Sequence, residues 1–156
     1  MTYRTLLKMV PPTATDQHMG HRVATVNGRQ IVMSYRKKPQ QQAHAKYEDF
    51  LKYDIAHRKD GIGSTFMFTT PICVKIRFMF PHPASVAKRD RNKTFLKTTR
   101  PDLDNMAKGL MDCIANVGII QDDALVWHLE LEKFLVPADK YGIDIEIDDN
   151  QSTNNN

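Results

Sequence analysis

The chain has 156 residues, of which 41% are hydrophobic and 26% are charged. These values fit a soluble globular protein with a single core. No window approaches 18 apolar residues, and the first residues lack the apolar stretch of a signal peptide. We therefore expect no membrane contact and a cytoplasmic location.

The net charge of +4 conceals an asymmetry along the chain. Residues 1–100 hold 19 Lys and Arg against 6 Asp and Glu, whereas residues 101–156 hold 3 against 12. A basic surface beside an acidic pocket predicts a protein that binds phosphates with one part and a metal ion with the other. In the plainer interpretation, the two halves only neutralise each other within one fold.

Hydrophobic periodicity in the N-terminal half predicts a strand over residues 6–10, a short strand over 30–34, a helix over about 41–58 and a long strand over 70–80. Pro11-Pro12 ends the first strand, and the short strand is expected to pair within its own basic segment across Asn27-Gly28. The helix carries one apolar stripe, and the long strand alternates apolar and other residues five times.

The C-terminal half predicts a strongly basic loop over residues 84–99, a helix over about 104–116, and strands over about 125–134 and 143–147. This order predicts an α/β (α+β) fold with a single mixed β-sheet and helices packed on it. We expect one domain over residues 1–148 and a polar, disordered tail over 149–156.

Four residues near the middle of the chain form the candidate site. Asp102 and Asp104 lie where the second helix is expected to start, with Asp104 at its N-cap, and Lys108 follows one turn later. Asp122-Asp123 opens the next strand, where alternation places Asp123 on the side covered by the helix. Carboxylates that a fold gathers usually hold a cation.

Each part of this pattern also has a structural interpretation. Asp104 could serve only as a cap, worth about 1 kcal/mol. Lys108 and Asp112 could form a surface i,i+4 pair, and Asp122-Asp123 could be a turn. The co-occurrence of all these residues beside a basic loop favours a shared site. We predict that Asp102, Asp104 and Asp123 bind Mg²⁺, for which Mn²⁺ can substitute, and that Lys108 contacts the scissile phosphate.

The segment Arg100-Pro101-Asp102-Leu103-Asp104-Asn105, followed by Lys108, Asp112 and Gln121-Asp122-Asp123-Ala124, resembles the RusA family of phage-type Holliday-junction resolvases. An acidic-then-basic pair, Glu132-Lys133, follows at the end of the next strand, as in that family. The resemblance is close over residues 98–134. It implies a small homodimer that cuts four-way DNA in a Mg²⁺-dependent way in recombination and repair, with catalytic residues Asp102, Asp104, Asp123 and Lys108.

Branched double-stranded DNA is the partner that this resemblance and the charge pattern predict. The residues expected to track its phosphates are Arg22, Arg29, Arg36, Lys37, Lys38, Lys88, Arg89, Arg91, Lys93, Lys97 and Arg100. No glycine-rich phosphate loop is present, so we expect no nucleotide cofactor. Two other functions are open: a DNA-binding protein without catalysis, and a metal nuclease that acts on flaps or forks.

Overall fold

The structure, a computed structural model, describes residues 1–16 and 19–150. Its elements are β1 (Thr2–Leu7), β2 (Gly20–Val26), β3 (Arg29–Tyr35), α1 (Lys38–His57), β4 (Ile72–Pro81), η2 (Lys88–Asp90), β5 (Phe95–Leu96), α2 (Leu103–Asn116), η3 (Asp123–Leu125), β6 (Val126–Val136) and β7 (Gly142–Asp148). Residues 17–18 and 151–156, which include most of the predicted tail, lie outside the described residues.

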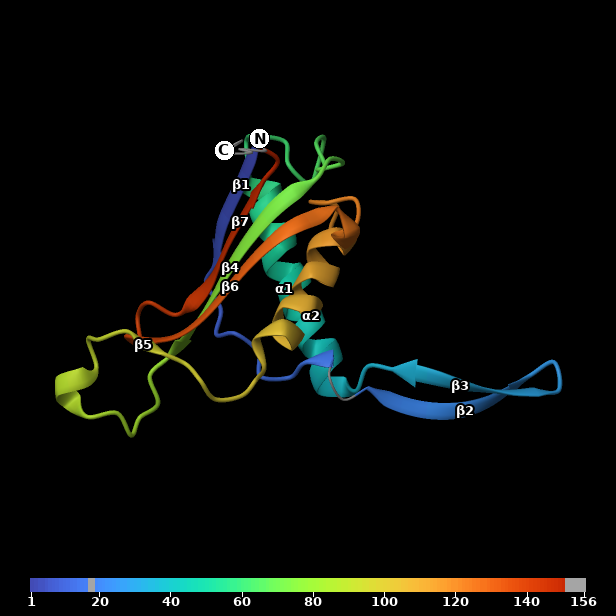
Figure 1. Cartoon of the computed structure of the whole chain (residues 1–156), viewed down its shortest axis with the longest axis horizontal. Helices are drawn as coiled ribbons and strands as arrows, with labels where there is room; N and C mark the ends of the chain where they lie inside the picture. Colours follow the sequence, from blue (N-terminus) through green and yellow to red (C-terminus); the bar gives the residue numbers. More distant parts are fainter. Residues whose placement is uncertain (17–18, 151–156) are drawn as a thin grey trace, which may run out of the picture.

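Five strands form the main sheet in the order β1-β7-β4-β6-β5. β4 and β6 are parallel, and the other neighbours are antiparallel. Figure 1 shows both α1 and α2 on one face of this sheet. The prediction of a mixed sheet with helices packed on it is confirmed. β4 lies close to the long strand predicted over residues 70–80. Every second residue of β4 is buried, as the alternation in the sequence indicated.

The core lies between the sheet and the two helices. Its fully buried side chains include Tyr3 of β1, Phe78 of β4 and Leu110 of α2. The β4 residues buried under the helices alternate with Lys75 and Arg77, which remain partly exposed on the opposite, polar face. This is the alternation expected of a sheet with one buried face. No helix in the described part of the chain has the length and apolarity needed to cross a bilayer.

β2 and β3 form a second sheet of two strands, which projects as an arm away from the body (Figure 1). The turn predicted at Asn27-Gly28 is present, with both residues at positive φ, 50° and 74°. Such a pair matches the twist of a two-residue hairpin. At the root of the arm, the ring of Tyr35 lies over Gly20, where a Cβ atom would come within 2.3 Å of it. A side chain at position 20 would therefore require the Tyr35 ring to move.

Several predicted boundaries differ from the structure. The first strand was expected over residues 6–10, but β1 begins at Thr2 because its partner β7 extends to Asp148. The basic 84–99 loop contains the turn η2 and the short strand β5, which pairs with β6. The Glu132-Lys133 pair lies inside β6 and does not end a strand, since β6 continues to Val136.

Candidate functional site

The start of α2 presents the first two aspartates. Arg100-Pro101 is a cis peptide, and Asp102 is extended at the N-cap of α2, with φ −72° and ψ 137°. The expectation that Asp104 caps this helix is wrong: Asp104 lies in its first turn. The helix begins earlier because Leu103 packs against the core and is already helical. Asp102 and Asp104 therefore do not share one extended segment, and the i,i+2 argument for their common direction does not apply.

Asp104, Lys108 and Asp123 line one groove of about 410 Å³ between α2 and β6. Asp104 and Lys108 are one helical turn apart and so project from the same face of α2. All three side chains belong to exposed residues, while apolar residues of α2 and β6 form the groove floor. This groove therefore brings together three of the four residues that the sequence singled out.

Asp123 reaches the groove by a route that strand alternation did not predict. It begins the single turn η3, and β6 begins only at Val126, so strand parity does not extend to Asp123. Asp122 stabilises this turn, because its carboxylate accepts a 2.8 Å hydrogen bond from the Ala124 amide. Alternation from Asp123 would place Trp127 on the covered face as well, but Trp127 is 55% exposed and the β4–β6 register shifts beside it.

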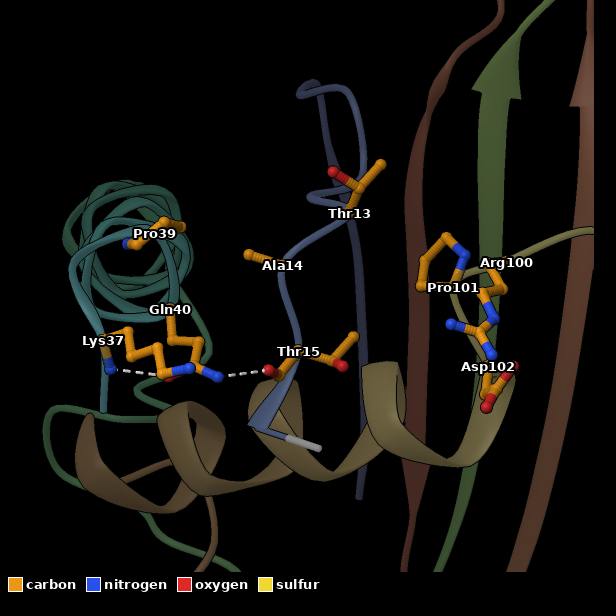
Figure 2. Close-up of a pocket in the computed structure, with 9 residues that line it drawn as sticks. All are labelled: Thr13, Ala14, Thr15, Lys37, Pro39, Gln40, Arg100, Pro101 and Asp102. Carbon is orange, nitrogen blue, oxygen red and sulfur yellow. Dashed lines mark hydrogen bonds between the residues drawn. The ribbon is translucent and has the colours of Figure 1, made fainter. Parts of the chain in front are cut away.

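Asp102 lines a different pocket, shown in Figure 2. This pocket lies between the loop after β1, the N-terminus of α1 and the segment before α2. Its walls are Thr13, Ala14, Thr15, Lys37, Pro39, Gln40, Arg100, Pro101 and Asp102. Among the described residues, Lys37 and Arg100 form no ion pair within 4 Å, so two cations face this pocket beside one carboxylate. Such a pocket suits an anionic group such as a phosphate.

The carboxylates of this region suit a hard divalent cation. Over residues 1–16 and 19–150, no three His, Cys, Asp or Glu side chains form a group that could hold a metal. The three-aspartate site stays a prediction. Asp104 and Asp123 nevertheless offer oxygen ligands to one groove. Mg²⁺ commonly takes one or two carboxylates and completes its shell with water and substrate phosphate, so the residues present fit this ion.

Lys133 is a positioning residue that the sequence did not single out for the site. Its ammonium group donates hydrogen bonds to the carbonyl oxygens of Thr99 and Pro101, at 2.7 and 2.6 Å. These bonds fix the segment that leads into Asp102. Lys97 lies nearby, over the ring of Phe80, and burial together with the charge of Lys133 lowers its pKa. In the sequence, this residue was noted only as part of the Glu132-Lys133 pair of the family resemblance.

Arg36, predicted to contact DNA, is engaged in a network at the root of the hairpin. Its guanidinium bonds Asp16 and Asp112, each at 3.0 Å, and Asp16 also contacts His44 at 3.1 Å. This network assigns a structural partner to Asp112, and Lys108–Asp112 is not among the ion pairs of the described residues. Sequence reasoning missed Asp16 and His44, because 28 residues separate them and no local pattern links them.

The buried thiol beside His44 is not a nucleophile. Cys113 Sγ lies 3.4 Å from His44 Nδ1, which with Asp16 resembles a Cys-His-Asp arrangement. The side chain is fully buried, and this burial raises the pKa of the Cys113 thiol to about 12. A thiol that stays protonated at neutral pH is inert, so the cysteine has a packing role.

Of the other predicted DNA contacts, Lys38 is the first residue of α1, and the rest lie on two exposed projections. Arg22 and Arg29 belong to the hairpin. The second projection is the segment from residue 82 to 99, on the opposite side of the body in Figure 1, and it carries Lys88, Arg89, Arg91 and Lys93. Lys93 pairs with Asp90 at 2.8 Å, and Arg89 lies 3.6 Å from the same carboxylate. In Figure 1, α2, the helix that carries Asp104 and Lys108, lies between these two projections.

A mixed sheet, exposed carboxylates beside a lysine in one groove, and a basic projection over residues 82–99 point to a protein of the nuclease type. Comparison with known families is specific: the model described as "Endodeoxyribonuclease RusA" matches residues 10–148. The chain belongs to the RusA family of endodeoxyribonucleases. Over 84 residues it is 33% identical to "Uncharacterized protein YqaN" of Bacillus subtilis (strain 168). That alignment covers 50% of this chain and 55% of the relative.

Proposed function

We propose that this protein is a Mg²⁺-dependent endodeoxyribonuclease that resolves Holliday junctions and related branched DNA in recombination and repair. It acts as a homodimer, because resolution requires two cuts and a two-fold dimer presents two equivalent sites. The observation that carries the proposal is the shared groove of Asp104, Lys108 and Asp123, next to the cationic pocket of Asp102. Both cysteines are free thiols, which is consistent with the cytoplasmic location that we propose.

Asp104 and Asp123 would hold the metal ion, with Asp102 as the third carboxylate when DNA is bound. Such an ion, when bound, would supply Lewis-acid chemistry at the scissile phosphate. Lys108, one turn above Asp104, places its ammonium in the same groove. There it neutralises the negative charge that develops on the phosphoryl oxygens during in-line attack.

The pocket beside Asp102 holds the DNA backbone next to the cleaved bond. Lys37 and Arg100 provide two cations on opposite sides of it, and Thr13 and Thr15 line the wall between them (Figure 2). A neighbouring phosphate held there fixes the strand relative to Asp102. Orientation of this kind accelerates cleavage because it removes the entropic cost of aligning the reacting groups.

The test compares two adjacent aspartates. Asp123→Asn removes a charge from the groove, while Asp122→Asn changes its neighbour, whose role is to stabilise the turn. We expect Asp123→Asn to reduce cleavage of a synthetic four-way junction in Mg²⁺ by at least about 100-fold, with junction binding retained. Asp122→Asn keeps most of the activity.

Substrate selectivity is measured in the same assay. Paired nicks on opposing strands of the four-way junction, with weak cleavage of flaps, forks and linear duplex, support resolution. Preferred cleavage of flaps or forks would contradict the junction assignment but leave the nuclease assignment intact. Equal cleavage by wild type and Asp123→Asn would remove the proposed site.

A further inference from the structure

We infer that the outer edge of β3 is the surface through which two copies of this chain associate. The two β3 strands pair antiparallel across a two-fold axis at Val32 and so join two hairpins into one four-stranded ribbon. This inference deepens the proposed function, because it rests on the homodimer proposed there and names its interface.

The hairpin exposes more apolar surface than a projecting arm needs. Val32 is 71% exposed and Val23, its cross-strand partner, is 64% exposed. Val26, Ile31, Met33 and Tyr35 are exposed as well. A two-stranded hairpin without further packing is marginally stable in water, and an exposed apolar patch of this kind marks an interaction site.

The composition of the arm favours a protein partner over a nucleic acid. Residues 20–35 contain Arg, Met and Tyr but no Lys, Asp or Glu. Buried interface cores are enriched in the first three residue types and depleted in the others. The arm offers two arginines to a phosphate backbone. It offers seven Val, Ile, Met, Ala and Tyr side chains to another apolar ribbon.

The backbone of β3 is available for pairing. Val26 and Arg29 flank the two-residue turn, so they form a hydrogen-bonded pair. Hydrogen-bonded and non-hydrogen-bonded pairs then alternate along the β2–β3 register. The amides and carbonyls of Gln30, Val32 and Ser34 consequently point away from β2. Within the described residues, neither strand of the arm pairs with a third strand, so these groups face outward.

Other free edges are protected against such pairing. The uncovered part of β6 carries Glu130 and Glu132, and β1 carries Arg4 in its centre. On β2, Arg22 lies next to Val23. If two β2 edges paired about a dyad at Val23, the two Arg22 side chains would approach each other. From residue 30 to 35, in contrast, β3 contains no charge and no proline, and every residue is exposed. Long, uncharged edges readily add a strand.

The sequence of β3 is self-complementary about Val32. With Val32 on the axis, Ile31 lies opposite the partner's Met33, and Gln30 lies opposite the partner's Ser34. Arg29 then lies opposite the partner's Tyr35, where a guanidinium can stack on a ring. Two copies related in this way bury an apolar pair on one face and satisfy the outward amides. The arm extends well beyond the sheet and helices, which leaves its edge open to a second chain (Figure 1).

The experiment compares two matched proline variants by sedimentation equilibrium, without DNA or metal. Val32→Pro removes an outward amide from the β3 edge, and Val23→Pro removes the matching amide from the β2 edge of the same cross-strand pair. Proline is tolerated where the amide faces away from the ladder, so neither change breaks the hairpin. We expect wild type and Val23→Pro at twice the chain mass of 17.9 kDa, and Val32→Pro at about 100-fold weaker association.

A second pair of variants guards against a local folding defect. Val32→Lys retains the amide but places two ammonium groups together at the axis, whereas Val23→Lys does not. Monomeric Val32→Lys with dimeric Val23→Lys supports the pairing. The pairing of β3 edges would be overturned if all four variants are dimers, or if only the Val23 variants lose the dimer. Either result would leave the homodimer itself intact. Dimeric Val32 variants that no longer bind the junction would assign the arm to DNA instead.

A monomeric wild-type protein at micromolar concentration would overturn both the edge pairing and the homodimer. The nuclease assignment is judged separately, by the Asp123→Asn assay, because sedimentation is measured without substrate. Failure of the interface and failure of the catalytic site are therefore distinguished.

Discussion

The ammonium group of Lys133 lies 2.6 Å from the carbonyl oxygen of Pro101, the residue that precedes Asp102. Lys133 belongs to β6, next to the edge strand β5 of the sheet, whereas Asp102 is the exposed N-cap residue of α2. A side chain of the rigid sheet thus holds the start of the helix that carries the candidate site. Positioning of this kind matters because displacements of about 1 Å can reduce catalysis by about 100-fold.

We predict that Lys133→Met reduces junction cleavage by at least about tenfold, which corresponds to about 1.4 kcal/mol in the activation barrier. The loss is expected in the cleavage rate under single-turnover conditions, since the ammonium group hydrogen-bonds main-chain oxygens of Thr99 and Pro101. Lys133→Arg retains donors to these carbonyls and is expected to restore part of the rate. Lys140→Met, at an exposed lysine in the turn after β6, is the control. Unchanged cleavage by Lys133→Met would contradict a positioning role.

Arg36→Met is expected to destabilise the protein by about 1–3 kcal/mol, because it removes the guanidinium partner of the Asp16 side chain, which is 9% exposed and also contacts His44. The partial exposure of Arg36 keeps this value below that of a fully buried pair. Asp112→Asn retains an oxygen that can accept from Arg36 and is expected to cost less. Urea unfolding with an unchanged m-value measures both. A larger effect of Asp112→Asn would show that the network is held mainly from α2.

The stability of the protein is expected to depend on Asp60 at acid pH. Hydrogen bonds from the Arg58 guanidinium hold the pKa of the Asp60 carboxyl below its usual range. An aspartate with a lowered pKa in the folded state stabilises the protein above its unfolded pKa of about 3.9, and this contribution is lost as pH falls through the folded value. Wild type therefore loses free energy of unfolding from about pH 5 downward, in part through this group.

In Asp60→Asn, that part of the pH dependence is absent. Denaturant unfolding at pH 7, 5 and 3.5 compares wild type, Asp60→Asn and Asp49→Asn, a control at an exposed aspartate of α1. The difference in stability between wild type and Asp60→Asn narrows as the pH falls. A constant difference across this range would contradict the assignment.

The projection over residues 82–99 is expected to contribute to DNA affinity by neutralising phosphates. Lys88→Gln with Arg89→Gln is predicted to reduce the slope of log K against log salt by about 1.8, because each phosphate that a cation neutralises adds about 0.9 to that slope. Lys52→Gln, at a 62% exposed lysine side chain of α1, is the charge-matched control for one of these changes. Binding is measured in the Asp123→Asn variant so that the junction stays intact. An unchanged slope would place the DNA elsewhere.

The sequence alone determined the elements that depend on local pattern. Alternation in β4 is visible because one sheet face is buried, and the stripe of α1 is visible because its period matches the helix. The Asn27-Gly28 turn was predictable because both residues tolerate positive φ. The acidic pattern from Asp102 to Asp123 likewise indicated the nuclease family, to which the chain belongs.

Only the tertiary structure decided how the candidate site is divided. Asp104 and Asp123 meet in one groove while Asp102 lines another pocket, because α2 begins at Leu103 and the η3 turn precedes β6. Helix starts and single turns depend on packing against distant residues, which local periodicity does not record. The engagement of Arg36 by Asp112 has the same cause: residues 76 positions apart become neighbours only when the chain folds.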